Sequence, residues 1–326
     1  MSIITVKQAV ADALAEEIRR DDKVFMLGED MGVYGGGFGV TRGFLDEFGP
    51  DIIMDTPISE GGFSGMAIGA AMMGYRPIVE FMFSDFVTCA MDLIVNQAAK
   101  MRFMLGGQVE IPIVFRTPAG SGTGAAAQHS QSLEAWFAHV PGLKVVMPAT
   151  PYDAKGLLKA SIRDDNPVMF YEHKIGYSVK GEVPDDEEII IPIGKGDIKR
   201  KGKDLTIISY SYTLIKCLEA AKELEKQGID AEVLDLRTLY PLDVDLIIES
   251  VKKTGKALIV HESVQKFGIG AEIAAVIADS EAFFHLDRPI ARLGGGDLPI
   301  PYSPELEAQI VPQIDTIVSA AVKLLK

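Results

Sequence analysis

Short runs of apolar and β-branched residues alternate with amphipathic stretches through the first half of the chain. The runs occupy residues 23–28, 77–81, 111–116, 143–148 and 167–172. Runs of this length are typical of strands that are buried on both faces, and the helical periodicity between them is typical of crossover helices. The pattern therefore predicts an α/β fold in which helices cover a parallel sheet.

The alternation breaks after Glu172, where Gly, Pro and runs of charge interrupt any period. It resumes with apolar runs at residues 204–210, 230–237, 256–262 and 289–294, and with helical stretches at about 213–226, after Pro241, near 269–279 and at the end of the chain. We therefore predict a first domain over residues 1–180, a linker over 181–203 and a smaller parallel-sheet domain over 204–326.

Length and composition agree with two folded domains. The chain has 326 residues, of which 48% are hydrophobic and 24% are charged, as in ordinary globular proteins. The formal net charge of −14 argues against a nucleic-acid partner, since such partners require a basic face. A basic protein partner remains compatible with this charge.

The sequence also bears on the compartment. Cys89 and Cys217 are the two cysteines, and they form no CxxC pair or metal-ligand spacing, so we expect neither a disulfide nor zinc. Residues 1–22 carry charges throughout, unlike a signal peptide. The apolar stretch 61–74 is shorter than the roughly 20 residues that cross a bilayer. These features predict a cytoplasmic protein with no membrane segment.

Residues 55–74, DTPISEGGFSGMAIGAAMMG, predict a strand end and then a helix with Ser59 as its cap. Glu60 falls in the first turn, where an isolated carboxylate most often just complements the helix dipole. The apolar surroundings favour a second interpretation, because desolvation suits a Glu to proton exchange. Gly61, Gly65 and Gly69 share one face, along which another backbone can approach closely.

Two further segments are candidates for chemistry. In residues 80–107 a strand ends at Phe81 and a long helix is expected after it, with Phe83 and Phe86 at the turn, where an aromatic ring could be core or could stack on a ligand. In residues 117–144 a loop rich in Gly and Ala leads into His129, which could exchange a proton near neutral pH or be purely structural.

Other motifs fail on spacing. GFSGM at 62–66 is not GxSxG, and VYGGGFGV at 33–40 does not reproduce GxGxxG, which makes a nicotinamide-dependent oxidoreductase a weak alternative.

Four segments together resemble the β subunits of the thiamine-diphosphate-dependent 2-oxo acid and acetoin dehydrogenases, over essentially the whole chain. They are LGED at 27–30, DTPISEGGFSG at 55–65, AAQHSQSLEAWFAHVPGLKVV at 126–146 and TPYDAKGLLKASIRDDNP at 150–167. The resemblance implies a transketolase-like pyrimidine-binding domain followed by the transketolase carboxy-terminal domain. It also implies decarboxylation of a 2-oxo acid such as pyruvate, or cleavage of acetoin, with acyl transfer to a lipoyl group.

The resemblance assigns roles to individual residues. Glu60 matches the carboxylate that hydrogen-bonds the aminopyrimidine of the coenzyme and promotes the tautomer that generates the ylid. Phe86 matches an aromatic that packs on this ring, and Glu29 and Ile58 match residues that line the pocket. His129 matches a histidine beside the reacting carbon. A potassium site of some relatives matches Ile113, Ala160, Ile162, Asp164 and Asn166.

One absence is informative: the sequence contains no GDG motif with a downstream Asn, by which thiamine enzymes hold the diphosphate through magnesium. The resemblance places this motif and the magnesium on an α subunit, so that an α2β2 tetramer shares the coenzyme. It also implies docking to a lipoyl-bearing acyltransferase core, through a small basic domain that suits the acidic charge.

Two alternatives remain. Branched-chain relatives tend to have a His at the position of Gln128. The Gln here weakens the case for a branched-chain substrate without excluding it. A non-catalytic assembly subunit of the same fold is disfavoured because Glu60, Phe86 and His129 are all present.

Overall fold

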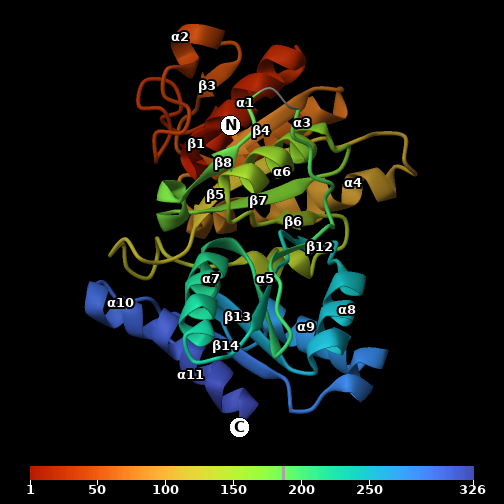
Figure 1. Cartoon of the computed structure of the whole chain (residues 1–326). Coiled ribbons are helices and arrows are strands. Elements are labelled where there is room, and N and C mark those ends of the chain that lie inside the picture. Colours follow the sequence, from red (N-terminus) through yellow and green to blue (C-terminus); the bar gives the residue numbers. More distant parts are fainter. Residues whose placement is uncertain (186–187) are drawn as a thin grey trace. The chain divides into compact units, whose positions relative to one another are not determined.

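The chain divides into two units in the computed structural model, which describes residues 1–185 and 188–326 (Figure 1). Unit 1 comprises Met1–Ala119 and Trp136–Ile193, and unit 2 comprises Gly120–Ala135 and Gly194–Lys326. Residues 120–135 thus group with unit 2, although the sequence pattern placed them within the first 180 residues.

Unit 1 is built on a sheet of parallel strands in the order β6-β7-β5-β4-β2-β3. Each predicted run contains part of one of these strands. The bounds are β2 (Val24–Gly28), β3 (Ile53–Asp55), β4 (Arg76–Glu80), β5 (Val114–Ala119), β6 (Lys144–Val146) and β7 (Val168–His173). All residues of β2, β5 and β7 are buried, which explains why these runs lack alternating polar positions.

Two helices of unit 1 pack on each other over this sheet, α1 (Val6–Arg20) and α6 (Pro151–Arg163) (Figure 1). Both begin at a threonine: Thr5 Oγ1 accepts a hydrogen bond from the Gln8 amide, and Thr150 Oγ1 accepts one from the Asp153 amide. Such caps satisfy amides that the first helical turn leaves without partners. Other elements of unit 1 are β1 (Ser2–Thr5), α2 (Phe44–Phe48), α3 (Glu60–Met72), α4 (Ala99–Met104), β8 (Lys180–Val183) and the short helix η3 (Ile175–Ser178). The short helix α5 (Glu134–Ala138) begins in unit 2 and ends in unit 1.

The long helix expected after residue 81 is interrupted. The chain forms a 3₁₀ segment, η1 (Ser84–Ala90), then a π-helical segment, η2 (Leu93–Ala98), and only then α4. Side-chain periodicity cannot distinguish these helix types, because they differ in which backbone carbonyl accepts each hydrogen bond.

Unit 2 has a sheet in the order β14-β13-β10-β11-β9, in which β9 runs antiparallel to β11 and the other described pairs of neighbours are parallel. Its strands are β9 (Asp197–Arg200), β10 (Leu205–Ser209), β11 (Ala231–Asp235), β13 (Ala257–Val264) and β14 (Ala291–Gly295), and β12 (Thr238–Tyr240) also belongs to this unit. The predicted parallel sheets are confirmed, with two corrections: β9 is antiparallel, and β1 and β8 form a separate antiparallel pair in unit 1.

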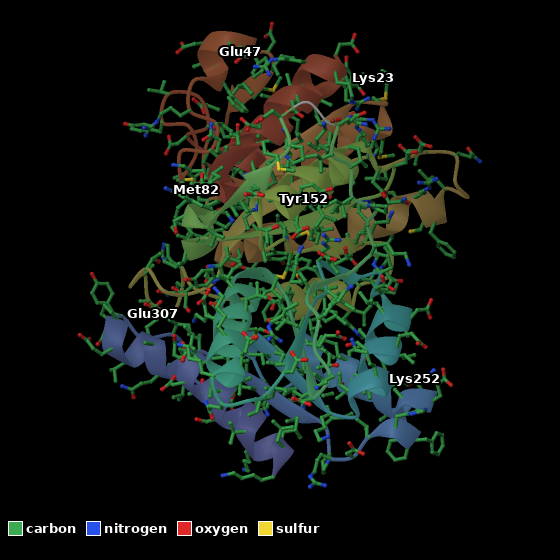
Figure 2. The ribbon with its side chains drawn as sticks, in the orientation of Figure 1. Lys23, Glu47, Met82, Tyr152, Lys252 and Glu307 are labelled. Carbon is green, nitrogen blue, oxygen red and sulfur yellow. The ribbon has the colours of Figure 1, made fainter. Side chains whose placement is uncertain are left out.

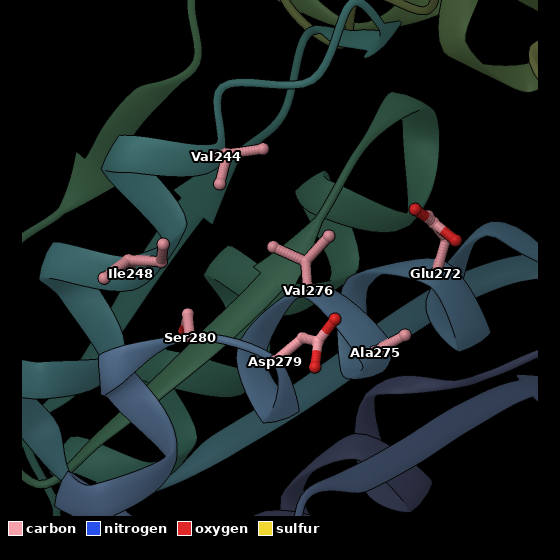
Figure 3. A pocket seen from close by; sticks show the side chains of 7 residues that line it. All are labelled: Val244, Ile248, Glu272, Ala275, Val276, Asp279 and Ser280. Carbon is pink, nitrogen blue, oxygen red and sulfur yellow. The ribbon is translucent and has the colours of Figure 1, made fainter.

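Helices pack on this second sheet at the predicted positions: α7 (Ser211–Glu225), α8 (Val244–Thr254), α9 (Ile269–Ala278) and, at the end of the chain, α11 (Ile314–Leu325), with the short η4 (Glu281–His285) between α9 and β14. An open groove of about 390 Å³ lies between α8 and α9, and Figure 3 shows the side chains that line it. Valine, isoleucine and alanine side chains line it, together with the carboxylates of Glu272 and Asp279.

Within the described residues, one helical stretch, Pro304–Leu325, is long and apolar enough to cross a membrane by length and composition. The structure divides it into α10 (Pro304–Ile310) and α11, which are separated at Val311. Helix α11 packs against α7, β13 and β14 and buries Ile317, Ala321 and Leu324. This is the arrangement of an amphipathic helix that covers the core of a globular domain.

His261, on β13, should make the protein sensitive to acid. Its ring is buried among Gly268, Gly270 and Gly294, and burial lowers its pKa from 6.5 to about 4. The unfolded chain therefore takes up a proton below pH 6.5, while the folded chain does so only near pH 4. Stability contributed by the neutral ring is complete above pH 6.5 and is lost as the pH falls to 4, by about 3 kcal/mol.

We expect His261→Asn to lose less stability than the parent between pH 7.5 and pH 4.5, measured by urea unfolding. The matched control is His285→Asn, since His285 is exposed, and it should behave like the parent. Equal losses in the parent and in His261→Asn would contradict the assignment.

Candidate functional site

Three neighbouring parallel strands end at one edge of the unit 1 sheet. Glu29 directly follows β2, Glu60 lies beyond the end of β3, and Phe86 lies beyond the end of β4. Strand β2 pairs with both β3 and β4. Because the carboxyl ends of parallel strands form the usual ligand-binding edge, the fold brings the candidates of unit 1 to such an edge.

Glu29 is a buried carboxylate, with 9% of the residue exposed. Its Oε1 has no hydrogen-bond partner among the described residues. Burial raises the pKa of Glu29, and the nearby negative charges of Glu60 and Asp30 raise it further. A buried polar atom without a partner is costly, so this oxygen is a candidate to receive a hydrogen bond from a ligand.

Glu60 is the first residue of α3 and is half-buried. Ser59 occupies the capping position as expected, but its side chain makes no capping hydrogen bond to any described residue, which corrects the predicted cap. The glycine face of α3 packs against η1 and η2. A Cβ on Gly61 would touch Cys89 O, and a Cβ on Gly65 would press on Leu93. Close backbone packing thus holds the start of α3, where Glu60 lies.

The three phenylalanines of the strand-to-helix turn lie in different surroundings. Phe81 is fully buried and packs against Phe63 and Phe115, so it belongs to the core. Phe86 is half-buried and meets Phe83 edge to face, with the ring centroids 5.7 Å apart. Ile58, between β3 and α3, is 84% exposed and is therefore available to a ligand or a partner chain.

The Gly-rich segment at 33–40 contributes to the same edge of the sheet. Its Gly37 amide donates a hydrogen bond to the carboxylate of Glu80, at the end of β4. A Cβ on Gly36 would collide with Glu80 Oε1, so this approach requires glycine. The segment 33–40, whose spacing does not fit a nucleotide-binding loop, therefore packs against a buried carboxylate.

Glu80 belongs to a buried network that the sequence analysis missed. Arg116 donates to Glu80 Oε2 (2.6 Å) and bidentately to Glu172 (2.6 and 2.8 Å), and the Tyr177 hydroxyl donates to Glu172 Oε2 (2.6 Å). Burial raises the pKa of Glu80, although Arg116 acts in the opposite direction. The only sequence signal is that β4, β5 and β7 each carry a charged residue within an apolar run.

His129 lies in unit 2, in a turn in which its amide donates to Ala126 O (3.3 Å) and Ala126 has a φ of +63°. The residue is half-buried, and the following Ser130 is buried. Farther along, Glu134 Oε1 accepts a hydrogen bond from the Tyr210 hydroxyl (2.8 Å), and burial raises the pKa of Glu134. His129 therefore lies in an ordered segment.

The residues matched to a potassium site lie at the end of α6 and near the starts of β5 and β7. Arg76 Nη1 donates to the carbonyl oxygens of Ile162 (3.1 Å) and Asp164 (3.2 Å). Arg102 Nη1 donates to Asn166 Oδ1 (2.9 Å), and the Val168 amide donates to Ile113 O (2.9 Å). A carbonyl oxygen has two lone pairs, so these oxygens still fit a cation, but guanidinium groups already neutralise the cluster.

Comparison with family models covers both units. Residues 2–180 match the model described as transketolase, pyrimidine binding domain, and residues 194–317 match transketolase, C-terminal domain. A solved structure, "Split gene transketolase, inactive beta4 tetramer", superposes with a TM-score of 0.80 over 99% of this chain and 98% of that chain, at 23% identity. The structural likeness supports the fold.

Curated relatives are more similar in sequence. The pyruvate dehydrogenase E1 component subunit beta of Rhizobium meliloti (strain 1021) is 49% identical over 98% of this chain and 69% of its own length. The 2-oxoisovalerate dehydrogenase subunit beta of Bacillus subtilis (strain 168) is 49% identical over 98% of both chains. The mitochondrial pyruvate dehydrogenase E1 component subunit beta of Bos taurus is 47% identical over 99% of this chain and 90% of its own.

Proposed function

We propose, since this chain belongs to the family of E1 beta subunits of the 2-oxo acid dehydrogenase complexes, that it holds the pyrimidine half of a thiamine diphosphate site. With an α subunit it would decarboxylate a 2-oxo acid such as pyruvate, or cleave acetoin, and transfer the acyl group to a lipoyl group. The Bacillus subtilis relative favours a branched-chain 2-oxo acid as the second candidate substrate, because its identity equals that of a pyruvate-type relative.

The observation that carries this proposal is the pair of carboxylates at the sheet edge. Glu29 has a buried oxygen without a partner among the described residues, and its pKa is raised first by burial and then by the nearby charge of Glu60. A ring with both donor and acceptor nitrogens would satisfy such a pair. Ile58 and Phe86 would provide apolar contact with it.

Thiamine diphosphate supplies a nucleophilic ring carbon that attacks the carbonyl of the substrate. We assign to Glu60 the task of holding and exchanging a proton with the pyrimidine nitrogen, for which a carboxylate is suited and an amide is not. Burial, and after it the nearby negative charges of Glu60 and Asp30, raise the pKa of Glu29, so Glu29 would keep its own proton to a higher pH than an exposed glutamate. His129 would act in acyl transfer to the lipoyl group.

The partner of this chain is an α subunit that supplies the diphosphate-binding motif and magnesium, in an α2β2 tetramer. Large apolar side chains of unit 1 support an interface: Met66 on α3 is 51% exposed, and Met73 and Tyr75 after it are 80% and 49% exposed. Met73 directly follows the last residue of α3, so these exposed side chains lie on α3 and just after its end.

The other assignments follow from the same proposal. Residues 1–180 would form the domain that binds the pyrimidine, residues 181–203 the linker, and residues 204–326 the carboxy-terminal domain. The protein would work in the cytoplasm. The acidic groove between α8 and α9 (Figure 3) supports docking of a basic domain of the acyltransferase core. Potassium at the end of α6 would add to the positive charge of Arg76.

Near-ultraviolet difference spectroscopy tests the proposal. The α/β complex should give a coenzyme signal when thiamine diphosphate and magnesium are added, and neither chain alone should. The absence of any signal from the complex would refute it and would favour a non-catalytic assembly subunit.

His129→Ala should lower lipoyl acylation by about 10²-fold, within the usual contribution of a positioned acid or base. Decarboxylation, followed with an artificial electron acceptor, should fall much less, and the complex should still assemble by light scattering. A variant that assembles poorly but acylates normally per assembled site would contradict this role.

A further inference from the structure

The loop that precedes His129 presents several backbone amides to two carboxylates within unit 2. The Ser121 amide and hydroxyl donate to Glu262 Oε1 (2.6 and 2.9 Å). The amides of Gly122 and Gly124 donate to Glu307 Oε1 (2.6 Å) and Oε2 (3.1 Å). The φ angles of Gly122 and Gly124 are +99° and +65°, values that favour glycine and that help nearby amides converge on one anion.

Glu307 is unusual for a glutamate on a short surface helix. It projects from α10, is labelled in Figure 2, and is only 2% exposed. Its carboxylate forms no ion pair with any cation in residues 1–185 and 188–326. A buried carboxylate needs compensation, and the two glycine amides are the groups that provide it here. The carboxylate and the loop therefore stabilise each other.

The segment is fixed on both sides of His129. Glu307 holds it at Gly122 and Gly124, and Tyr210 holds Glu134 at the other end. Between them the turn from Ala126 to His129 is closed by a backbone hydrogen bond. Removing the Glu307 contacts would release the residues between Ser121, which Glu262 still holds, and the turn that carries His129.

We propose that Glu307 is a positioning residue for the acyl-transfer step: its carboxylate fixes the loop at 122–124 and thereby sets the place of His129. The inference rests on the function proposed for His129. Glu307 itself need not touch substrate or coenzyme, because it acts through the glycine amides.

Hydrogen exchange tests the anchor without relying on activity. In the α/β complex, Glu307→Gln should speed deuterium uptake in peptides that cover residues 120–128 by about tenfold, since charge-assisted hydrogen bonds are lost. Glu305→Gln is the matched control, because Glu305 lies on the same helix and accepts from Ser303 rather than from the loop. Should Glu307→Gln fail to assemble, Glu307→Asp keeps the charge but shortens the reach, and should also speed uptake.

Unchanged uptake in the assembled Glu307 variant, or an equal increase in Glu305→Gln, would overturn the anchor. Uptake remains informative even if the parent complex proves inactive, so a failure of the proposed function and a failure of this inference can be told apart.

A double-mutant cycle tests the link to His129. Glu307→Gln should lower kcat for lipoyl acylation about tenfold, with less than about a twofold change in decarboxylation measured with an artificial electron acceptor. In a His129→Ala background, Glu307→Gln should cause little further loss. A full additional tenfold loss in that background would show that Glu307 acts independently of His129 and would overturn the proposal.

Discussion

Glu60→Gln should lower turnover of the reconstituted α/β complex by at least about 10²-fold, which is the lower range for loss of a positioned proton-exchanging group. The amide keeps the size of the side chain but cannot exchange a proton. Glu60 is half-buried at the start of α3 and lies near the buried Glu29. Because the substitution preserves the shape of the side chain there, it should leave assembly intact. Carbon dioxide release and lipoyl acylation give the rates, and size-exclusion chromatography reports assembly.

Glu47→Gln is the matched control for this experiment. Glu47 also lies in unit 1, but it forms an exposed ion pair with Arg19, so its variant should have parental rates. A Glu60→Gln complex that retains more than about a tenth of the parental rate would contradict the assigned role, which rests on a change near 10²-fold.

Arg116→Met should destabilise unit 1 by about 3–5 kcal/mol, because it leaves two buried carboxylates without their cation. Arg116 is 1% exposed and its guanidinium meets both Glu80 and Glu172. Burial by itself lowers the pKa of Arg116, but the two carboxylates raise it overall, so it is charged at every working pH. Urea unfolding followed by circular dichroism measures the loss.

Two comparisons sharpen this second experiment. Arg19→Met breaks an exposed pair with Glu47 and should cost at most about 1 kcal/mol. Adding Glu172→Gln to Arg116→Met should recover part of the lost stability, since it removes one buried charge. If Arg116→Met were as stable as Arg19→Met, the buried network of Arg116, Glu80 and Glu172 would not contribute to the stability of unit 1.

The sequence predicted the elements that apolar periodicity controls. The parallel strands of both units and helices α7, α8 and α9 appear near the expected positions, because buried strands and amphipathic helices have distinct patterns. Interruption of the helix after β4 by 3₁₀ and π segments was not predicted, because these helix types share similar side-chain patterns. The antiparallel β9 was missed for a related reason: a short edge strand carries no signal of its direction.

The candidate site, like the fold, was predicted from the sequence only in part. Glu60 was predicted in the first helical turn because a strand was expected to end before Ser59 and a helix to begin after it, and Glu60 is found there. Phe81 was grouped with Phe83 and Phe86, but it faces the core, because β4 ends at Glu80 and the chain bends into η1 before Phe83 and Phe86. The partners of Arg116 and of Glu307 lie far away in sequence, so no local pattern could reveal them.

We propose that this chain is half of a thiamine diphosphate enzyme. The most direct measurement is lipoyl acylation with pyruvate, acetoin and 2-oxoisovalerate as substrates, using this chain alone, the α subunit alone, and the two combined with thiamine diphosphate and magnesium. We predict turnover of at least one substrate by the combination and none by either chain alone. Turnover by this chain alone, or none of any substrate by an assembled complex that holds the coenzyme, would contradict the account.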